Sequence, residues 1–149
     1  MGKAGEMRGF ASVGHYIQGP GAIHALPRVV ETLGKRAIML IGPHFYDREI
    51  AFLEGLFRDS SVEVRFQKFQ GDCTESEIQG IKQTISQMPG GVQAAIGFGG
   101  GKSLDTVRVA AGQLGLPMVL IPTSPATNAA TSGLSVVYDE QHMGKTVFL

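Results

Sequence analysis

The chain has 149 residues, of which 43% are hydrophobic and 17% charged, enough for one domain with a packed core but not for two large ones. Thirteen basic and thirteen acidic residues cancel, so the net charge favours neither a nucleic acid nor a membrane surface as partner. The single cysteine excludes an internal disulfide, and the sequence has no long apolar run or signal-peptide pattern. These features predict a cytoplasmic protein.

The first part of the chain predicts strands and helices in alternation. Residues 16–21 indicate a short strand closed by a turn, and residues 22–33 carry apolar side chains at helical spacing. Residues 37–41 form a compact apolar run typical of a buried strand. The apolar positions of residues 50–57 then fall on one face of a helix.

The same alternation continues through the middle of the chain. Residues 62–67 alternate as in a strand, and the Thr-Glu-Ser-Glu pattern at 74–77 resembles a capping box that opens a helix. Residues 92–98 and 117–121 are apolar strands, with a helix over 103–114 between them. Repeated strand–helix units predict a parallel sheet that helices cover on both faces.

The pattern changes near the carboxyl end. Residues 134–138 and 145–149 read as two strands around a turn, which predicts an antiparallel hairpin. The fold class is therefore α/β, a Rossmann-like parallel sheet with flanking helices plus a carboxyl-terminal β-hairpin. Because the chain stops on an apolar strand, we expect residues 1–149 to be the first domain of a longer protein, with a naturally short product as the alternative.

A glycine-rich turn is the most informative feature of the sequence. Residues 97–106, Gly-Phe-Gly-Gly-Gly-Lys-Ser-Leu-Asp-Thr, join a strand to a helix. Glycines let an anion approach the main chain, the first helical N–H groups lack partners, and Lys102 adds a full positive charge. A Walker A loop would need glycine in place of Ile96, and a dinucleotide fingerprint would need it in place of Lys102. The turn therefore predicts an anion site that matches neither motif.

Other candidate residues gather around this turn or are set aside. Loops that follow parallel strands meet at one edge of a sheet, so residues 42–44, 99–102 and 122–128 are expected to converge. Cys73 lies in a loop without a neighbouring histidine, which favours a structural role. The four histidines lack the spacing of a zinc site, so no metal ligand is expected in this chain.

Several segments together resemble the glycerol dehydrogenase branch of the iron-containing (metal-dependent) alcohol dehydrogenases. They are residues 99–106, 122–123 and 132–138, with 16–19 and 71–75 also similar. The resemblance covers nearly the whole chain but only the amino-terminal half of the family's architecture. It implies that this half is the dinucleotide-binding domain, whereas a helical second domain supplies Asp and His ligands to zinc or iron.

The resemblance also implies cofactor-binding residues. The pyrophosphate would be held by Gly100, Gly101 and Lys102, and Asp105 would lie near the cofactor in the following helical turn. Thr123 would contact the adenine side. The nicotinamide half would be flanked by Ser132, Leu134 and Tyr138.

Two positions depart from the family pattern. Asn128 stands where glycerol dehydrogenases usually have an Asp near the substrate hydroxyls, which makes it the catalytic candidate and leaves substrates other than glycerol open. Pro43 stands where members that prefer NAD often place an Asp on the ribose, so NADP is open beside NAD.

The leading function implied by the resemblance is the NAD(P)-binding half of a metal-dependent polyol dehydrogenase, which transfers hydride between a secondary alcohol and nicotinamide. We expect this chain alone to be inactive and the full-length protein to form a homo-oligomer. The alternatives are an enzyme resembling hydroxycarboxylate or glycerol-1-phosphate dehydrogenases and a stand-alone nucleotide-binding module.

Overall fold

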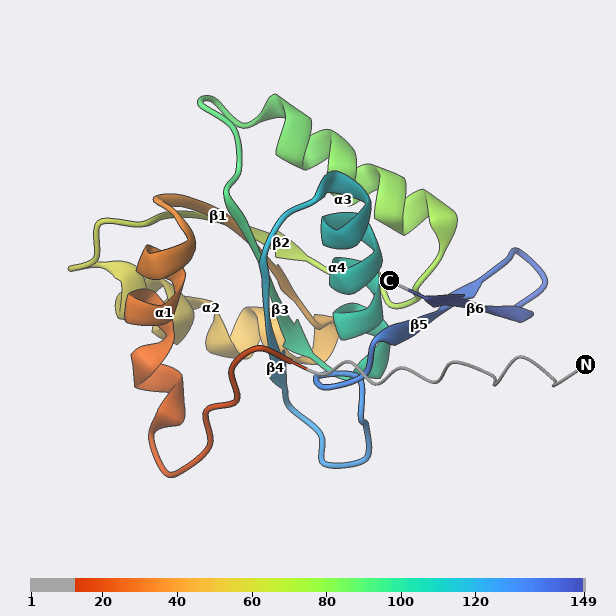
Figure 1. The fold of residues 1–149 in the computed structure, drawn as a ribbon, viewed down its shortest axis with the longest axis horizontal. Helices are drawn as coiled ribbons and strands as arrows, with labels where there is room; N and C mark the ends of the chain where they lie inside the picture. The colour runs from red at the N-terminus through yellow and green to blue at the C-terminus, as the bar shows by residue number, and fades with distance from the viewer. Residues whose placement is uncertain (1–12, 149) are drawn as a thin grey trace, which may run out of the picture.

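The computed structural model describes residues 13–148, and its centre is a four-stranded parallel sheet (Figure 1). The strand order is β2-β1-β3-β4, so β1 and β3 lie in the middle. The strands are β1 (Arg36–Ile41), β2 (Glu63–Lys68), β3 (Ala94–Gly99) and β4 (Met118–Pro122). Met39 of β1 is paired with Phe66 on one side and Ile96 on the other. The predicted parallel sheet is confirmed.

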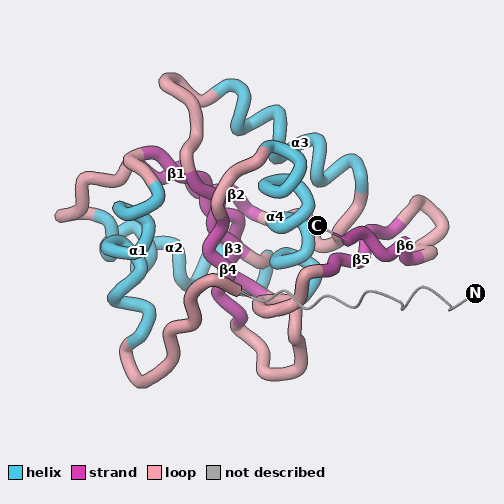
Figure 2. The backbone as a smooth tube through the Cα atoms, viewed as in Figure 1, coloured by secondary structure: helices cyan, strands magenta, loops and turns pink. Residues whose placement is uncertain are grey.

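Helices cover both faces of this sheet, as Figures 1 and 2 show. Helices α1 (Leu26–Leu33) and α2 (Pro43–Phe57) lie on one face, and α3 (Glu75–Gln87) and α4 (Gly101–Leu114) on the other. A short 3₁₀ helix, η1 (Ala22–Ala25), precedes α1. None of the helices within residues 13–148 is long and apolar enough to cross a membrane.

Strand β1 shows why its sequence is continuously apolar. Ile38 and Leu40 pack into the cluster beneath α3 and α4, whereas Ala37, Met39 and Ile41 pack into the cluster beneath α1 and α2. All five side chains are at most 2% exposed. A strand covered on both faces needs an apolar residue at every position, so alternation is lost.

The start of α3 is a partly formed capping box. Thr74 Oγ1 accepts the N–H of Glu77 at 3.3 Å, as the sequence predicts. The Glu77 carboxylate accepts the N–H of Gln70 at 3.2 Å, and the Thr74 N–H donates to the carbonyl of Asp72 at 3.1 Å. Glu77 thus ties the loop after β2 to the helix instead of closing the box, and burial raises the pKa of its carboxyl.

Two expectations near the amino end were wrong in part. Residues 16–21 form no strand, and the side chains of Tyr16 and Ile17 are 67% and 56% exposed. A strand forms only where a neighbouring strand pairs with it, and none does so here among the described residues. The helix expected over 22–33 begins as 3₁₀, because Pro27 has no N–H to continue an α-helix from Ile23.

The carboxyl-terminal hairpin is confirmed as a separate two-stranded sheet. It consists of β5 (Leu134–Tyr138) and β6 (Gly144–Phe148), paired antiparallel. Leu149, which was expected in the last strand, lies outside the described residues. In Figure 1 the hairpin lies beside α4 and projects away from the main sheet.

Candidate functional site

The site is built where two neighbouring central strands lead to opposite faces of the sheet. Strand β1 continues into α2 on one face, whereas its neighbour β3 continues into α4 on the other. The two connecting loops therefore diverge and leave a crevice at the carboxyl ends of the strands. Parallel α/β sheets bind ligands at such a switch point.

Glycines let the chain segments at this crevice touch. The N–H of Gly42 donates to the carbonyl of Phe98 at 2.8 Å. A Cβ atom at Gly99 would lie 3.3 Å from the Cα atom of Gly42 and would overlap the Oγ atom of Ser103. Only glycine fits at position 99, since the backbone of the β1 loop and the first turn of α4 both press against it.

The loop after β4 joins the same place. The N–H of Thr123 donates to the carbonyl of Gly99 at 2.9 Å, and Thr127 Oγ1 lies 3.0 Å from where a Cβ atom of Gly101 would stand. The predicted convergence of the three loops is confirmed. Asn128 is exposed, and its main-chain carbonyl accepts hydrogen bonds from the N–H groups of Thr131 and Ser132, each at 3.0 Å.

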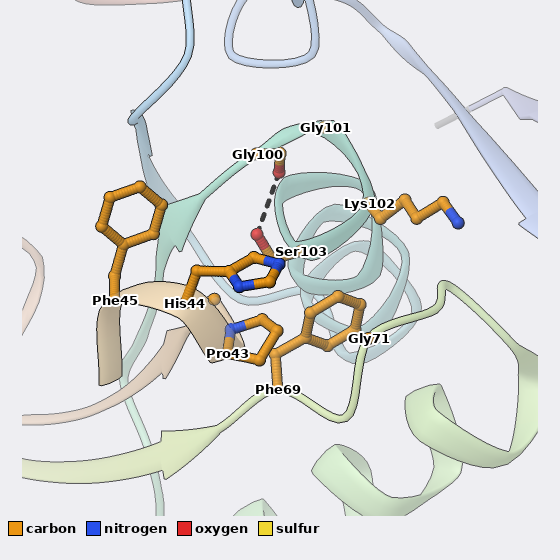
Figure 3. Close-up of a pocket in the computed structure, with 10 residues that line it drawn as sticks. Pro43, His44, Phe45, Phe69, Gly71, Gly100, Gly101, Lys102 and Ser103 are labelled. Carbon is orange, nitrogen blue, oxygen red and sulfur yellow. Dashed lines mark hydrogen bonds between the residues drawn. The ribbon is translucent and has the colours of Figure 1, made fainter. Parts of the chain in front are cut away.

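The amino end of α4 offers main-chain donors. Gly100 is the N-cap and no side chain caps the helix. Ser103 Oγ instead donates to the carbonyl of Gly100 at 2.9 Å, the contact drawn in Figure 3. The first N–H groups of a helix have no acceptor within it, and together they carry the positive end of the helix dipole. This end of α4 is therefore chemically suited to an anion.

A cavity of about 240 Å³ lies in front of these donors. Its walls are Gly42 and the first turn of α2 (residues 43–45), Phe69 and Gly71 after β2, and residues 100–103. In Figure 3 the rings of Pro43, His44 and Phe69 gather near the turn. Phe45 and Phe69 are not among the residues predicted for the site, although both follow the ends of predicted strands.

Lys102 lines the cavity but turns its ammonium elsewhere. In Figure 3 its side chain points away from His44 and Phe45. The Nζ atom pairs with Asp72 Oδ1 at 2.6 Å and lies 5.3 Å from the ring centroid of Tyr138. The hydrogen bond to Asp72 raises the pKa of Lys102. The lysine stays cationic and lies between the loop after β2 and the hairpin.

Asp105 and Arg108 join α4 to the hairpin. Arg108, only 4% exposed, donates from Nη1 to Asp105 Oδ1 at 2.8 Å, to the carbonyl of Leu134 at 2.9 Å and to Ser135 Oγ at 3.0 Å. The second carboxylate oxygen of Asp105 accepts the N–H of Val136 at 3.2 Å. The carboxylate is thus engaged inside the chain, and its expected place beside a cofactor stays a prediction.

Arg108 is a structural residue that the sequence analysis missed. The sequence does contain a sign of this role, because Arg108 is a charged residue within the otherwise apolar run 107–111. It follows Asp105 by three positions, which places the two side chains on one face of the helix.

The structure brings only some of the predicted site residues to the cavity. Gly100, Gly101 and Lys102 line it, whereas Thr123 and Asn128 lie in the adjoining β4 loop. Ser132 and Leu134 lead into the hairpin, where the Ser132 Oγ atom accepts the N–H of Leu134 at 3.1 Å. Tyr138 is tied to the loop after β2, because its N–H donates to the carbonyl of Cys73 at 2.7 Å. Their cofactor roles stay predictions.

Within residues 13–148, the cysteine does not form a reactive nucleophile, and acidic and histidine side chains do not form a metal site. Cys73 is fully buried, and burial raises the pKa of its thiol to about 11. A protonated, inaccessible thiol is a poor nucleophile. No three His, Cys, Asp or Glu side chains gather as metal ligands in this part of the chain. The described residues therefore do not fit a zinc or iron centre.

Comparison with known proteins gives consistent matches. The family described as iron-containing alcohol dehydrogenase matches residues 14–149. A glycerol dehydrogenase from Thermotoga maritima is 34% identical over 125 residues, which are 84% of this chain and 33% of the relative. Hydroxycarboxylate dehydrogenase A from Escherichia coli is 43% identical over 72 residues, 48% of this chain and 19% of that protein.

The fold has a solved counterpart as well. The crystal structure of a probable glycerol dehydrogenase from Sinorhizobium meliloti 1021 superposes with a TM-score of 0.82 at 31% identity. The match covers 96% of this chain and 38% of that one. The chain spans about a third of the length of the curated relatives it matches.

Proposed function

The chain belongs to the iron-containing alcohol dehydrogenase family, and on that premise we propose that it is the dinucleotide-binding domain of a metal-dependent polyol dehydrogenase. The observation that carries the proposal is the uncapped start of α4 at Gly100, which opens onto a cavity at the switch point of the sheet. The assignment of residues 1–149 to one domain, a cytoplasmic location and a homo-oligomeric whole protein belong to the same proposal and rest on the family resemblance.

The residues present fit the pyrophosphate of a dinucleotide. The N–H groups of Gly101, Lys102 and Ser103 would donate to its oxygens, and the Lys102 ammonium would supply the counter-charge. A Cβ atom at Gly100 would meet nothing within 4 Å, so the main chain is open to approach there. Phe45 and Phe69 are among the residues that line the cavity and would give a base apolar contacts there.

We propose that the site accepts NADP as well as NAD. Among the described residues that line the cavity there is no carboxylate, and the start of α2 contributes Pro43 and His44. A carboxylate at this place would bind the ribose hydroxyls of NAD and repel the 2′-phosphate of NADP. Because the described lining has no such carboxylate, it would not repel the 2′-phosphate of NADP.

The substrate class follows from the relatives and from Asn128. The matches named glycerol dehydrogenase favour a polyol, whose carbinol carbon would deliver hydride to the bound nicotinamide. Asn128 would place a neutral amide near the substrate, where it can hydrogen-bond a hydroxyl without repelling an anion. That property and the match to hydroxycarboxylate dehydrogenase A support a hydroxycarboxylate as the second candidate. Because the described residues offer no metal site, we propose that this chain alone does not turn over substrate.

Calorimetric titration of this chain with NAD, NADP and ATP tests the proposal. We expect a dinucleotide to bind and Lys102→Ala to weaken it roughly tenfold, because a charge-assisted hydrogen bond to phosphate is lost. Lys68→Ala is the matched control, since Lys68 forms another surface ion pair, with Asp47. Absence of dinucleotide binding would contradict the proposal, and turnover of a polyol by this chain alone would contradict its predicted inactivity.

A further inference from the structure

We propose that Asp72 is an internal counter-ion that competes with the dinucleotide for Lys102 and so sets the affinity of the site. The inference rests on the proposed function. It adds Asp72, which belongs neither to the glycine turn nor to the residues that line the cavity. Lys102 lines the cavity, whereas Asp72 does not; its neighbour Gly71 does.

The ion pair is short and only partly shielded from water. The Nζ atom of Lys102 lies 2.6 Å from Asp72 Oδ1, with the lysine side chain 53% exposed and the aspartate side chain 29% exposed. Lys102 belongs to the first turn of α4, where a cation is unfavourable because the helix dipole is positive. Asp72 offsets this positive charge.

The backbone holds Asp72 in place. Its carbonyl accepts the N–H of Thr74, and the next carbonyl, that of Cys73, accepts the N–H of Tyr138 at 2.7 Å. A bridge between Thr74 and Tyr138 adds to this connection. The backbone segments that carry Asp72 and Tyr138 are therefore held side by side, and the ammonium of Lys102 lies beside both side chains.

Two consequences follow for an anion that enters the cavity. It gains the Lys102 ammonium only by drawing it away from Asp72, and it then meets the uncompensated negative charge that remains at Asp72. Two further ionisable groups lie near this carboxylate, His142, whose Nδ1 atom is 3.7 Å from Asp72 Oδ2, and the neighbouring thiol of Cys73. Asp72 Oδ1 is buried, and its ion pair with Lys102 compensates its charge. Drawing the ammonium away leaves that oxygen uncompensated, so removing the Asp72 charge should tighten binding by roughly two- to fivefold.

The sign of this effect separates competition from a structural role. Asp72→Asn keeps the shape of the side chain and removes its charge, so we expect NAD to bind two- to fivefold more tightly than to the unchanged chain. Asp47→Asn removes the same charge from the Lys68 ion pair and should leave affinity unchanged. Unchanged or weaker NAD binding by Asp72→Asn would overturn the inference, because a merely structural aspartate would weaken the site when replaced.

A measurement on the unaltered chain covers the case in which Asp72→Asn folds poorly. The NMR signal of the Lys102 ammonium should shift when inorganic pyrophosphate is added, while that of Lys68 stays in place. A Lys102 signal that does not move would overturn the inference. If the unaltered chain binds NAD but the variant gains nothing, only this inference fails; if the unaltered chain binds no dinucleotide, the proposed function fails with it.

Discussion

Replacing Arg108 by methionine should destabilise the domain more than any other change to a single charged side chain considered above. Methionine keeps the apolar part of the side chain but removes the guanidinium, which is 4% exposed in the fold. Its Nη1 atom donates to Asp105, to the carbonyl of Leu134 and to Ser135 at 2.8–3.0 Å. The ion pair within α4 and the two hydrogen bonds from Arg108 to the start of the hairpin would be lost.

The size of the effect follows from what is left behind. The Asp105 carboxylate, 14% exposed, would keep the N–H of Val136 as a partner but lose its cation. Breaking a buried ion pair by removing one member destabilises by about 3–5 kcal/mol. Because Asp105 is partly exposed and the buried Nη2 atom of Arg108 has no hydrogen-bond partner among the described residues, the loss here should lie near the lower end of that range. A domain of this size is stable by only about 5–15 kcal/mol, so this is a large share of the total.

Equilibrium unfolding in urea, followed by circular dichroism, measures the loss. Hydrogen exchange should in addition show that the Val136 amide loses protection, because the hairpin is released from α4. Arg65→Met is the control, since Arg65 lies exposed on β2 and should change stability by less than about 0.5 kcal/mol. A loss below about 1 kcal/mol for Arg108→Met would refute the reasoning.

Two further predictions concern the cysteine and the glycine turn. Burial raises the pKa of Cys73 from 9.0 to about 11, so the folded state keeps a proton that the unfolded chain releases. The unfolding free energy should therefore fall as pH rises from 9 to 11, by at most roughly 1.4 kcal/mol per pH unit. The Cys73→Ala variant should lack this decrease. If the unfolding free energies of the variant and the unaltered chain fall in parallel with pH, the prediction is contradicted. Gly100→Ala should change the unfolding free energy by less than about 0.5 kcal/mol, because the added methyl group meets no atom within 4 Å. It should nevertheless weaken NAD binding about tenfold, because the methyl group obstructs the approach of the ligand to the main chain. Unchanged NAD affinity would show that the ligand does not approach this turn.

The sheet and the position of the glycine turn could be predicted because each depends on local pattern. Strand β1 is apolar at every position, and a strand buried on both faces needs that composition. The turn at Gly99 follows a similar run, so the topology places it at the carboxyl edge of the sheet. In contrast, residues 16–21 begin with Tyr16 and Ile17, which suit a short strand before a turn, but pairing depends on a partner that the local sequence does not reveal.

The contacts that shape the site lie between residues far apart in the sequence. Lys102 meets Asp72 from a loop thirty positions earlier, and Arg108 reaches the carbonyl of Leu134 across twenty-six positions. No periodicity or short motif encodes such pairs, because they arise only when the loops and the hairpin dock on α4. The role of Asp105 shows the same limit, since its sequence position suits a ligand contact and an internal ion pair equally well.

The central claim is that a dinucleotide binds at the start of α4, and amide NMR shifts on titration of this chain with NAD test it most directly. The account predicts that the largest shifts fall on Gly100, Gly101 and Lys102 and on the β1 loop at Gly42, with the more distant α1 unaffected. Shifts confined to other surfaces, such as the far end of the hairpin near Met143, with the glycine turn unchanged, would contradict it.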